Sequence, residues 1–208
     1  MPDRAAHDWP ARLELGIAER ALPGESRSGD RAVLVGYEGG ALVAAIDGLG
    51  HGGDAADAAD AAAQVLAEHP DEEPVRLLDR CHRALARTRG AVMTVAWFDL
   101  VAGSLSWTGV GNVEGRLVHA AAGPHAPTHG ALTKGGVVGY KLPSIRVTGT
   151  DLDHGDVMVL ATDGIDSDFA RAIGEGGSAQ EIADRILAAH GKPSDDALVV
   201  VVRYRHAR

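Results

Sequence analysis

Aspartates stand at the ends of several apolar segments. Asp47 and Asp163 each follow an apolar run and precede a glycine, in LVAAID-G and VMVLATD-G. Asp195 and Asp196 precede the run ALVVVV, and Asp30 opens the run DRAVLV. Side chains at strand ends converge on one rim of a sheet, where clustered carboxylates repel one another unless a cation lies between them. The pattern favours a site for a hard divalent cation such as Mg²⁺ or Mn²⁺, which prefers oxygen ligands.

A glycine follows both strand-ending aspartates. Because glycine has no Cβ, other groups can approach its backbone closely, so Gly48 can offer its carbonyl oxygen as a ligand. Asp-Gly is also a common turn after a strand, and the spacing alone leaves the turn and the metal site both open. Cys81 is the only cysteine, which excludes a cysteine-rich zinc site. It falls in a predicted helix without a phosphate cradle, which disfavours a covalent cysteine mechanism.

Apolar periodicity predicts the strands that must position these aspartates. Residues 11–20 alternate apolar and polar, which is typical of a half-buried strand. Residues 31–47 predict two strands around Glu38-Gly39-Gly40, because glycine supplies the positive φ of a tight turn. Further strands are predicted over 91–100, 104–112, 113–121, 156–164 and 196–205. Hairpins dominate this order, so the sheets should be largely antiparallel.

Three helices are predicted between the strands. The alanine-rich residues 53–69 form the first, with Asp54 as its N-cap. Residues 74–89 form an amphipathic second helix, and 177–191 a third that begins after Ser178. This order is not the regular strand–helix alternation of a doubly wound parallel sheet. The fold class is therefore α+β.

Composition limits the class of protein. The chain has 208 residues, a net charge of −9 and 45% hydrophobic residues, which fits one domain over residues 1–208. The negative charge disfavours nucleic acid, whose phosphates would be repelled. The sequence has neither a membrane-length apolar run nor a signal peptide, and a single cysteine suits a reducing compartment. We expect a cytoplasmic monomer that binds neither nucleic acid nor membrane.

Five motifs carry a resemblance to a known family. They are, in order, SGD at 28–30, DGLGHGGDAADAA at 47–59, GVGNVEGRL at 109–117, HGDVMVLATDGI at 154–165 and SDDALVVVV at 194–202. Together they resemble the metal-dependent PPM (PP2C-type) serine/threonine phosphatases, in the SpoIIE-like branch. The compact length and GGVVGYKLP at 135–143 resemble the stressosome phosphatases of that branch. The resemblance covers residues 12–204 and implies a four-layer α-β-β-α sandwich of two largely antiparallel sheets flanked by helices.

The resemblance also implies a site of two Mn²⁺ or Mg²⁺ ions at one end of the paired sheets. On that pattern Asp47 bridges both ions, and the Gly48 carbonyl binds one of them. Asp163 and Asp195 match the remaining ligands. Asp30 matches the acid of the first motif, which acts on the metal or its waters. The implied reaction is hydrolysis by a water that the ions activate.

Three further residues either depart from the family pattern or are expected to support the metal ligands without binding metal. Asp196, where the wider family often has Asn, is expected to support the ligands rather than to bind metal. His51 lies three residues after Gly48, and is either the general acid for the leaving group or a histidine that fixes its loop. Arg27 either replaces a phosphate-binding arginine of some relatives or is a solvated loop residue.

Two classes of function follow. The first is a metal-dependent phosphatase that acts on phosphoserine or phosphothreonine of a regulatory protein of the STAS or stressosome type. The alternative is a catalytically weak phosphatase-fold module that binds and regulates a signalling partner. Loss of the metal aspartates is the usual mark of inactive relatives, and all of these positions are aspartate here. The sequence therefore favours the enzyme.

Overall fold

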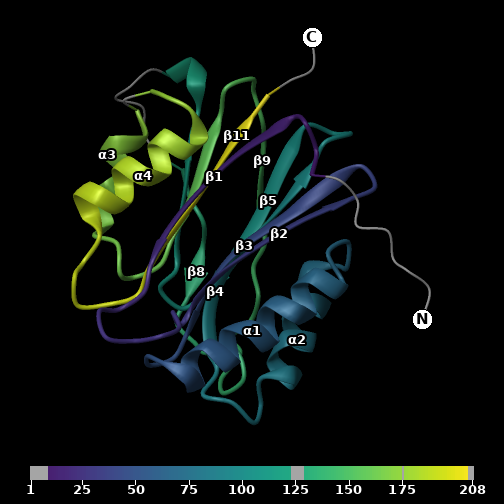
Figure 1. The fold of residues 1–208 in the computed structure, drawn as a ribbon. Coiled ribbons are helices and arrows are strands. Elements are labelled where there is room, and N and C mark those ends of the chain that lie inside the picture. The colour runs from purple at the N-terminus through teal and green to yellow at the C-terminus, as the bar shows by residue number, and fades with distance from the viewer. Residues whose placement is uncertain (1–8, 123–128, 175, 206–208) are drawn as a thin grey trace.

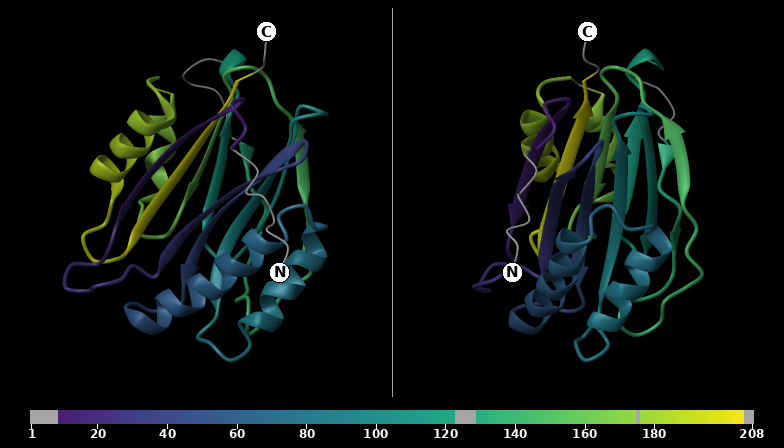
Figure 2. Two further views of the ribbon diagram at one scale, coloured as in Figure 1. Left: turned by 45° about the vertical axis from the view of Figure 1, so that its right-hand side comes forward. Right: turned by 90° about the vertical axis from the view of Figure 1, so that its right-hand side faces the viewer.

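The computed structural model describes residues 9–122, 129–174 and 176–205, and it contains two β-sheets packed face to face with helices on both outer sides (Figure 1). The two further views in Figure 2 show the same layers from the side. This arrangement confirms the predicted α+β class and the α-β-β-α sandwich. No helix in the described residues is long and apolar enough to span a membrane.

The first sheet is built on the predicted hairpin. Its strand order is β2-β3-β4-β5-β8, and β9 also pairs with β5. All of these pairs are antiparallel except β5 with β8. The strands are β2 (Asp30–Tyr37), β3 (Gly40–Gly48), β4 (Ala91–Asp99), β5 (Ser104–Val110), β8 (Thr133–Lys134) and β9 (Thr148–Asp151).

The second sheet joins the two ends of the chain. Its order is β1-β11-β10-β6-β7, and every pair is antiparallel. The strands are β1 (Leu13–Arg20), β6 (Glu114–Val118), β7 (His129–Gly130), β10 (Val157–Ala161) and β11 (Ala197–Tyr204). The N-terminal strand β1 therefore pairs along its full length with the C-terminal strand β11.

Helices cover the outer face of each sheet (Figure 1). α1 (Gly53–Glu68) and α2 (Pro74–Ala84) pack on the first sheet, and α4 (Ala179–His190) packs on β1 and β11 of the second. The short α3 (Ala170–Ile173) lies against α4, and two 3₁₀ turns occur at Ala120–Ala122 and Ser167–Phe169. The second helix ends five residues before the predicted end at 89.

The central strands are buried on both faces, which explains their continuous apolar sequences. Successive side chains of a strand point to opposite faces. In β3, Ala41, Val43 and Ala45 pack between the sheets, whereas Leu42, Ala44 and Ile46 pack under α1 and α2. β11 alternates in the same way between the inter-sheet core and the core under α4. Three apolar layers therefore separate four structural layers.

The helix caps were predicted with mixed success. Ser178 caps α4 in a full capping box with Glu181, as predicted. The prediction of Asp54 as the N-cap of α1 is wrong, because Gly52 occupies that position and Asp54 lies in the first turn. Gly52 has φ 73° and ψ −152°, a conformation that glycine adopts readily and aspartate does not.

Candidate functional site

A cavity of about 480 Å³ opens where β3 and β10 end and β11 begins. Three of the predicted aspartates, Asp47, Asp163 and Asp195, line it together. The other lining residues are Leu22, Leu49, Gly50, His51, Val92, Asn112, Val137 and Ser194. The fold thus gathers carboxylates from three distant segments at one cavity, which local sequence cannot do.

Asp30 lies just behind this cavity. It is the cross-strand partner of Asp47 in the β2–β3 register and is only 2% exposed. The hydroxyl of Thr162 donates a 2.7 Å hydrogen bond to Asp30 Oδ2. Burial raises the pKa of Asp30 to about 7, although the Thr162 hydrogen bond opposes the shift. Thr162, which the sequence analysis did not select, therefore holds Asp30 in place.

The carboxylate of Asp47 is partly buried, and within the described residues it has no hydrogen-bond or ion-pair partner. Burial raises its pKa to about 8, with further contributions from the charges of Asp30, Asp163 and Asp195. The pKa of Asp195 is also raised, by burial and then by Asp163. Protons or cations must therefore offset the charge of this cluster at neutral pH.

The donor set fits a hard divalent cation. Among the described residues, no three or more His, Cys, Asp or Glu side chains already form a tight metal-binding group. Asp47, Asp163 and Asp195 instead line one cavity of about 480 Å³. Mg²⁺ keeps several of its waters and needs only one or two carboxylates from the protein. Oxygen donors around an open cavity therefore suit such an ion better than they would suit zinc.

Asp163 is fixed from two sides by residues that the sequence analysis did not place in the site. Asn112 Nδ2 donates a 2.8 Å hydrogen bond to Asp163 Oδ2. Lys192 Nζ donates a 2.6 Å hydrogen bond to the Asp163 backbone carbonyl. Lys192 gives no signal in the sequence, because its contact depends on the loop that joins α4 to β11.

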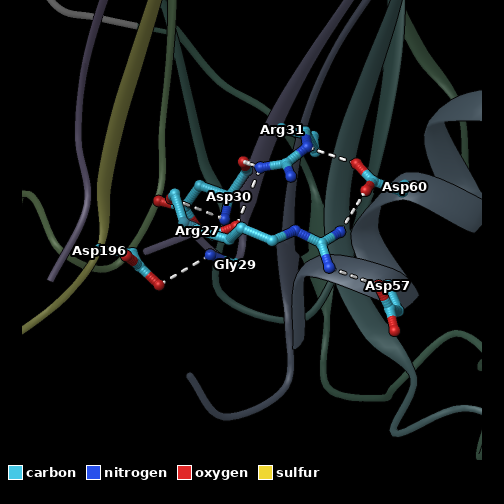
Figure 3. Close-up of polar contacts among 8 residues, drawn as sticks. Arg27, Gly29, Asp30, Arg31, Asp57, Asp60 and Asp196 are labelled. Atoms are coloured by element: carbon cyan, nitrogen blue, oxygen red, sulfur yellow. Dashed lines mark hydrogen bonds and ion pairs between the residues drawn. The ribbon is translucent and has the colours of Figure 1, made fainter. Parts of the chain in front are cut away.

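Asp196 supports the site without lining the cavity. Its Oδ1 accepts a 2.7 Å hydrogen bond from the Leu22 amide. Its Oδ2 accepts a 2.8 Å hydrogen bond from the Gly29 amide (Figure 3). One buried carboxylate thus ties both ends of the loop that leads into Asp30. The role of Asp196 in supporting the metal ligands stays a prediction.

The glycines after Asp47 and Asp163 are needed for packing within the protein. A Cβ on Gly48 would lie 2.0 Å from the carbonyl oxygen of Ala55 in α1. A Cβ on Gly164 would lie 1.8 Å from the carbonyl oxygen of Asp196. The Asp-Gly pattern therefore reflects neighbouring backbone that passes close behind each aspartate. Binding of metal by the Gly48 carbonyl stays a prediction.

His51 lies on the rim of the cavity with its side chain 65% exposed. Its Nδ1 is 2.8 Å from Glu25 Oε1. A carboxylate partner on Nδ1 fixes the orientation of the imidazole and leaves Nε2 available. This geometry is compatible with both predicted roles, the general acid and the residue that fixes its loop.

Arg27 does not line the cavity, because it pairs with two acidic residues of α1, Asp57 and Asp60, here called the acidic stripe. Its guanidinium pairs with Asp57 and Asp60 at 2.8 Å each, and Arg31 also pairs with Asp60 (Figure 3). The hydrogen bonds to Asp57 and then Asp60 raise the pKa of Arg27. The predicted phosphate-binding role of Arg27 therefore has no support in this geometry, and the arginine instead joins the loop before β2 to α1.

Cys81 is excluded as a nucleophile. It is fully buried in α2, and burial raises the pKa of its thiol to about 12. A reactive cysteine needs access and a lowered pKa. Cys81 meets neither condition.

Comparison with known proteins agrees with this geometry. The family model described as "Stage II sporulation protein E (SpoIIE)" matches residues 37–205. The phosphoserine phosphatase RsbX of Bacillus subtilis (strain 168) is 22% identical over 179 residues, which are 86% of this chain and 88% of RsbX. The chain belongs to the SpoIIE family, and its fold and enzyme class are those of the PP2C-type metal-dependent protein phosphatases.

Two solved structures illustrate the likeness. One is described as "The bacterial stressosome: a modular system that has been adapted to control secondary messenger signaling". It is 30% identical, with a TM-score of 0.84 over 92% of this chain and 99% of that chain. The other is RsbX in complex with magnesium, 20% identical, with a TM-score of 0.83 over 94% of this chain and 96% of that one. The predicted resemblance to the SpoIIE-like branch of the PP2C-type phosphatases is confirmed.

Proposed function

We propose that the protein hydrolyses phosphoserine or phosphothreonine on a regulatory protein of the STAS or stressosome type, using two divalent cations. The observation that carries this proposal is the partly buried Asp47 carboxylate, which has no partner among the described residues and shares one cavity with Asp163 and Asp195. A carboxylate cluster that needs positive charge at neutral pH is suited to binding Mn²⁺ or Mg²⁺.

The proposed ligands are the Asp47, Asp163 and Asp195 carboxylates and the Gly48 carbonyl. Asp30, the cross-strand partner of Asp47, would act on the metal or its waters. Two divalent cations bound there would lower the pKa of a water and offset charge on the phosphoryl oxygens. Other residues of the chain hold these ligands in place. Thr162 orients Asp30 and Asn112 orients Asp163, and such outer contacts hold ligands in the geometry that metal binding needs.

His51 is the proposed proton donor to the leaving serine or threonine oxygen. Its Nδ1 contact with Glu25 keeps the ring at the cavity rim. With Nδ1 held by Glu25, the imidazole presents Nε2 as the atom from which a proton can pass to the leaving oxygen. Glu25 thereby acts as a positioning residue for His51.

The substrate class rests on the relatives. RsbX is a phosphoserine phosphatase, and the 30% identical structure comes from work on the bacterial stressosome. We extend both statements to this chain as a proposal, together with a cytoplasmic location, a single domain and a monomeric state. Because the cavity is open to the surface and only about 480 Å³ in volume, it can admit a phosphorylated side chain while the rest of the partner stays outside.

Phosphate release from a phosphorylated STAS-type protein tests the proposal. Release is measured with Mn²⁺, with Mg²⁺ and with chelator, for the wild type, Asp47→Ala and Asp163→Ala, after circular dichroism has verified folding. Asp79→Ala is the matched control, because Asp79 is a half-buried acid of α2 that pairs with Arg83 and does not line the cavity. We expect metal-dependent release that both site variants lose and the control keeps.

Three results would overturn parts of this proposal. Release that persists in both site variants contradicts the two-metal mechanism. If the wild type binds the phosphoprotein but releases no phosphate with either metal, the protein is a binding module instead. Turnover of small phosphate esters alone would contradict the protein substrate.

A further inference from the structure

Charge is unevenly distributed along the chain. Residues 115–150 contain no Asp or Glu, but they contain Arg116, Lys134, Lys141 and Arg146. All 29 acidic residues lie outside this stretch of a chain whose net charge is −9. Where the fold exposes the cations of such an acid-free run, they can attract an anionic partner.

Part of this stretch, residues 129–147, here called the basic segment, borders the carboxylate cavity. Val137 lines the cavity and exchanges two backbone hydrogen bonds with Lys141, of 2.9 and 2.8 Å. The carbonyl of Lys134 accepts a 2.9 Å bond from Gly111, the residue before Asn112. From there the chain runs along one flank of the molecule, green in the right-hand view of Figure 2. The basic segment therefore contributes Val137 to the cavity wall, and Lys141 is hydrogen-bonded directly to that residue.

Two of these cations are available to a partner. Lys141 and Arg146 are exposed, and within the described residues neither side chain has a recorded hydrogen bond or ion pair. By contrast, Lys134 Nζ donates to Ser144 Oγ at 2.7 Å, and Arg116 pairs with Glu114. Lys141 and Arg146 are thus the cations that a docked chain can meet without breaking an existing pair.

The basic segment also exposes apolar surface beside these charges. Tyr140, next to Lys141, is 85% exposed, and Leu132 is 51% exposed. Aromatic residues are enriched in protein interfaces, so an exposed tyrosine next to an exposed lysine is a suitable contact for a partner chain. Cationic and apolar contacts together suit a polypeptide better than a small phosphate ester.

A second cavity gives the docked chain a path away from the carboxylates. It has a volume of about 290 Å³ and shares Asn112 with the first cavity. Gly130, Ala131 and Thr133 of the basic segment form part of its wall. Residues that flank a phosphorylated side chain held at the carboxylates can therefore follow the basic segment.

We propose that the basic segment is the docking surface for the protein substrate and selects phosphorylated residues flanked by acidic side chains. Lys141 and Arg146 supply the charge recognition. This inference rests on the proposed phosphatase function and adds the chemistry of the substrate around the phosphate.

The experiment compares three phosphoserine peptides that differ only in whether their flanking residues are acidic, neutral or basic. The ratio of kcat/KM for the acidic peptide to that for the neutral one is measured at low ionic strength with Mn²⁺. Two exposed ion pairs predict a ratio of about five to ten, which falls when added salt screens the charges. In Lys141→Gln/Arg146→Gln the ratio should fall to near one. The matched control Arg171→Gln removes an exposed cation from α3 on the other sheet and should keep the wild-type ratio.

A binding measurement separates this inference from the proposed function. Fluorescence anisotropy of the same labelled peptides reports docking without turnover. If no peptide is hydrolysed but the acidic one binds more tightly and the double variant loses that preference, docking stands and the phosphatase proposal fails. If the wild type hydrolyses acidic and neutral peptides with equal kcat/KM and binds them equally, the docking inference is wrong and the phosphatase proposal stands.

Discussion

Asp30 and Asp47 face each other directly in the antiparallel register of β2 and β3. Like charges directly opposite each other destabilise a sheet, and both side chains lie at least partly out of water. The pair is therefore stable only with a proton or a cation. That condition links the fold of the first sheet to the proposed metal site and leads to the first prediction.

The metal-free protein should lose stability as the pH rises. The folded-state pKa values of Asp30 and Asp47 are raised to about 7 and about 8, whereas in the unfolded chain such groups titrate near ~3.9. Between these values the folded state holds more protons, so the free energy of unfolding decreases from about pH 4 to about pH 8. Chemical denaturation in chelator across this range measures the decrease.

The same denaturation measurement is made on a matched variant and in the presence of Mn²⁺. Asp47→Asn removes one of the two raised groups and should flatten the decrease. Mn²⁺ binds the deprotonated carboxylates, so its stabilising effect should grow as the pH rises. A wild-type protein that becomes more stable between pH 5 and pH 8 in chelator, relative to Asp47→Asn, would contradict this prediction.

Gly164→Ala should destabilise the protein even though it adds only a methyl group. The new Cβ would lie 1.8 Å from the Asp196 carbonyl oxygen, so the backbone must shift, at a cost of about 2 kcal/mol or more. Gly53→Ala is the control, because nothing lies within 4 Å of its Cβ position. That variant should change the free energy of unfolding by less than about 1 kcal/mol. Urea denaturation compares the two.

Asp196→Ala should loosen the loop that precedes Asp30. It leaves the Leu22 and Gly29 amides without their acceptor, and each unsatisfied buried donor costs about 1–3 kcal/mol. Hydrogen exchange at these two amides should become faster. Asp99→Ala is the matched control, because Asp99 also accepts hydrogen bonds from two backbone amides, those of Val101 and Ala102. These two amides lie in an exposed turn, where water can replace the lost carboxylate. Equal effects of the two variants on stability would refute the role of Asp196.

Asn112→Ala should weaken metal binding without unfolding the protein. Asn112 is exposed, and its amide donates to Asp163 at 2.8 Å. Loss of such an outer contact typically lowers metal affinity about 10- to 100-fold. Asn112→Asp should lower the affinity for Mn²⁺ further than Asn112→Ala does, because it places a second negative charge against Asp163. Calorimetric titration with Mn²⁺ gives the affinities, and an unchanged value in Asn112→Ala would contradict the contact's proposed role.

His51→Gln should affect substrates according to their leaving groups. An alkoxide leaves poorly without a proton, and general acids contribute about 10²–10⁴-fold. The variant should therefore lose at least about 100-fold in kcat on a phosphoprotein but little on p-nitrophenyl phosphate, whose phenolate leaves unaided. Equal losses on both substrates would show that His51 only fixes its loop.

The sequence patterns predicted the aspartates that line the cavity, but not all of the residues that hold these aspartates in place. Asp47, Asp163 and Asp195 were visible because each follows or precedes a buried strand, and the fold brings them to one cavity. Thr162 and Lys192 were not selected, because their contacts with Asp30 and the Asp163 carbonyl join residues 132 and 29 positions apart. Asp54 was assigned as a cap because its residue type suits one, whereas the turn before α1 requires the positive φ of Gly52.

Apolar alternation, turn glycines and residue propensities act over a few residues, so the sequence by itself determined the strands, the helices and the aspartates at the strand ends. It also supplied the acid-free run from 115 to 150. Only the tertiary structure decided that Arg27 binds the acidic stripe of α1, that Asp196 ties down the loop before Asp30, and that the basic segment borders the cavity. The physical reason is that burial, charge pairing and close backbone approach depend on which distant segments the packed sheets bring together.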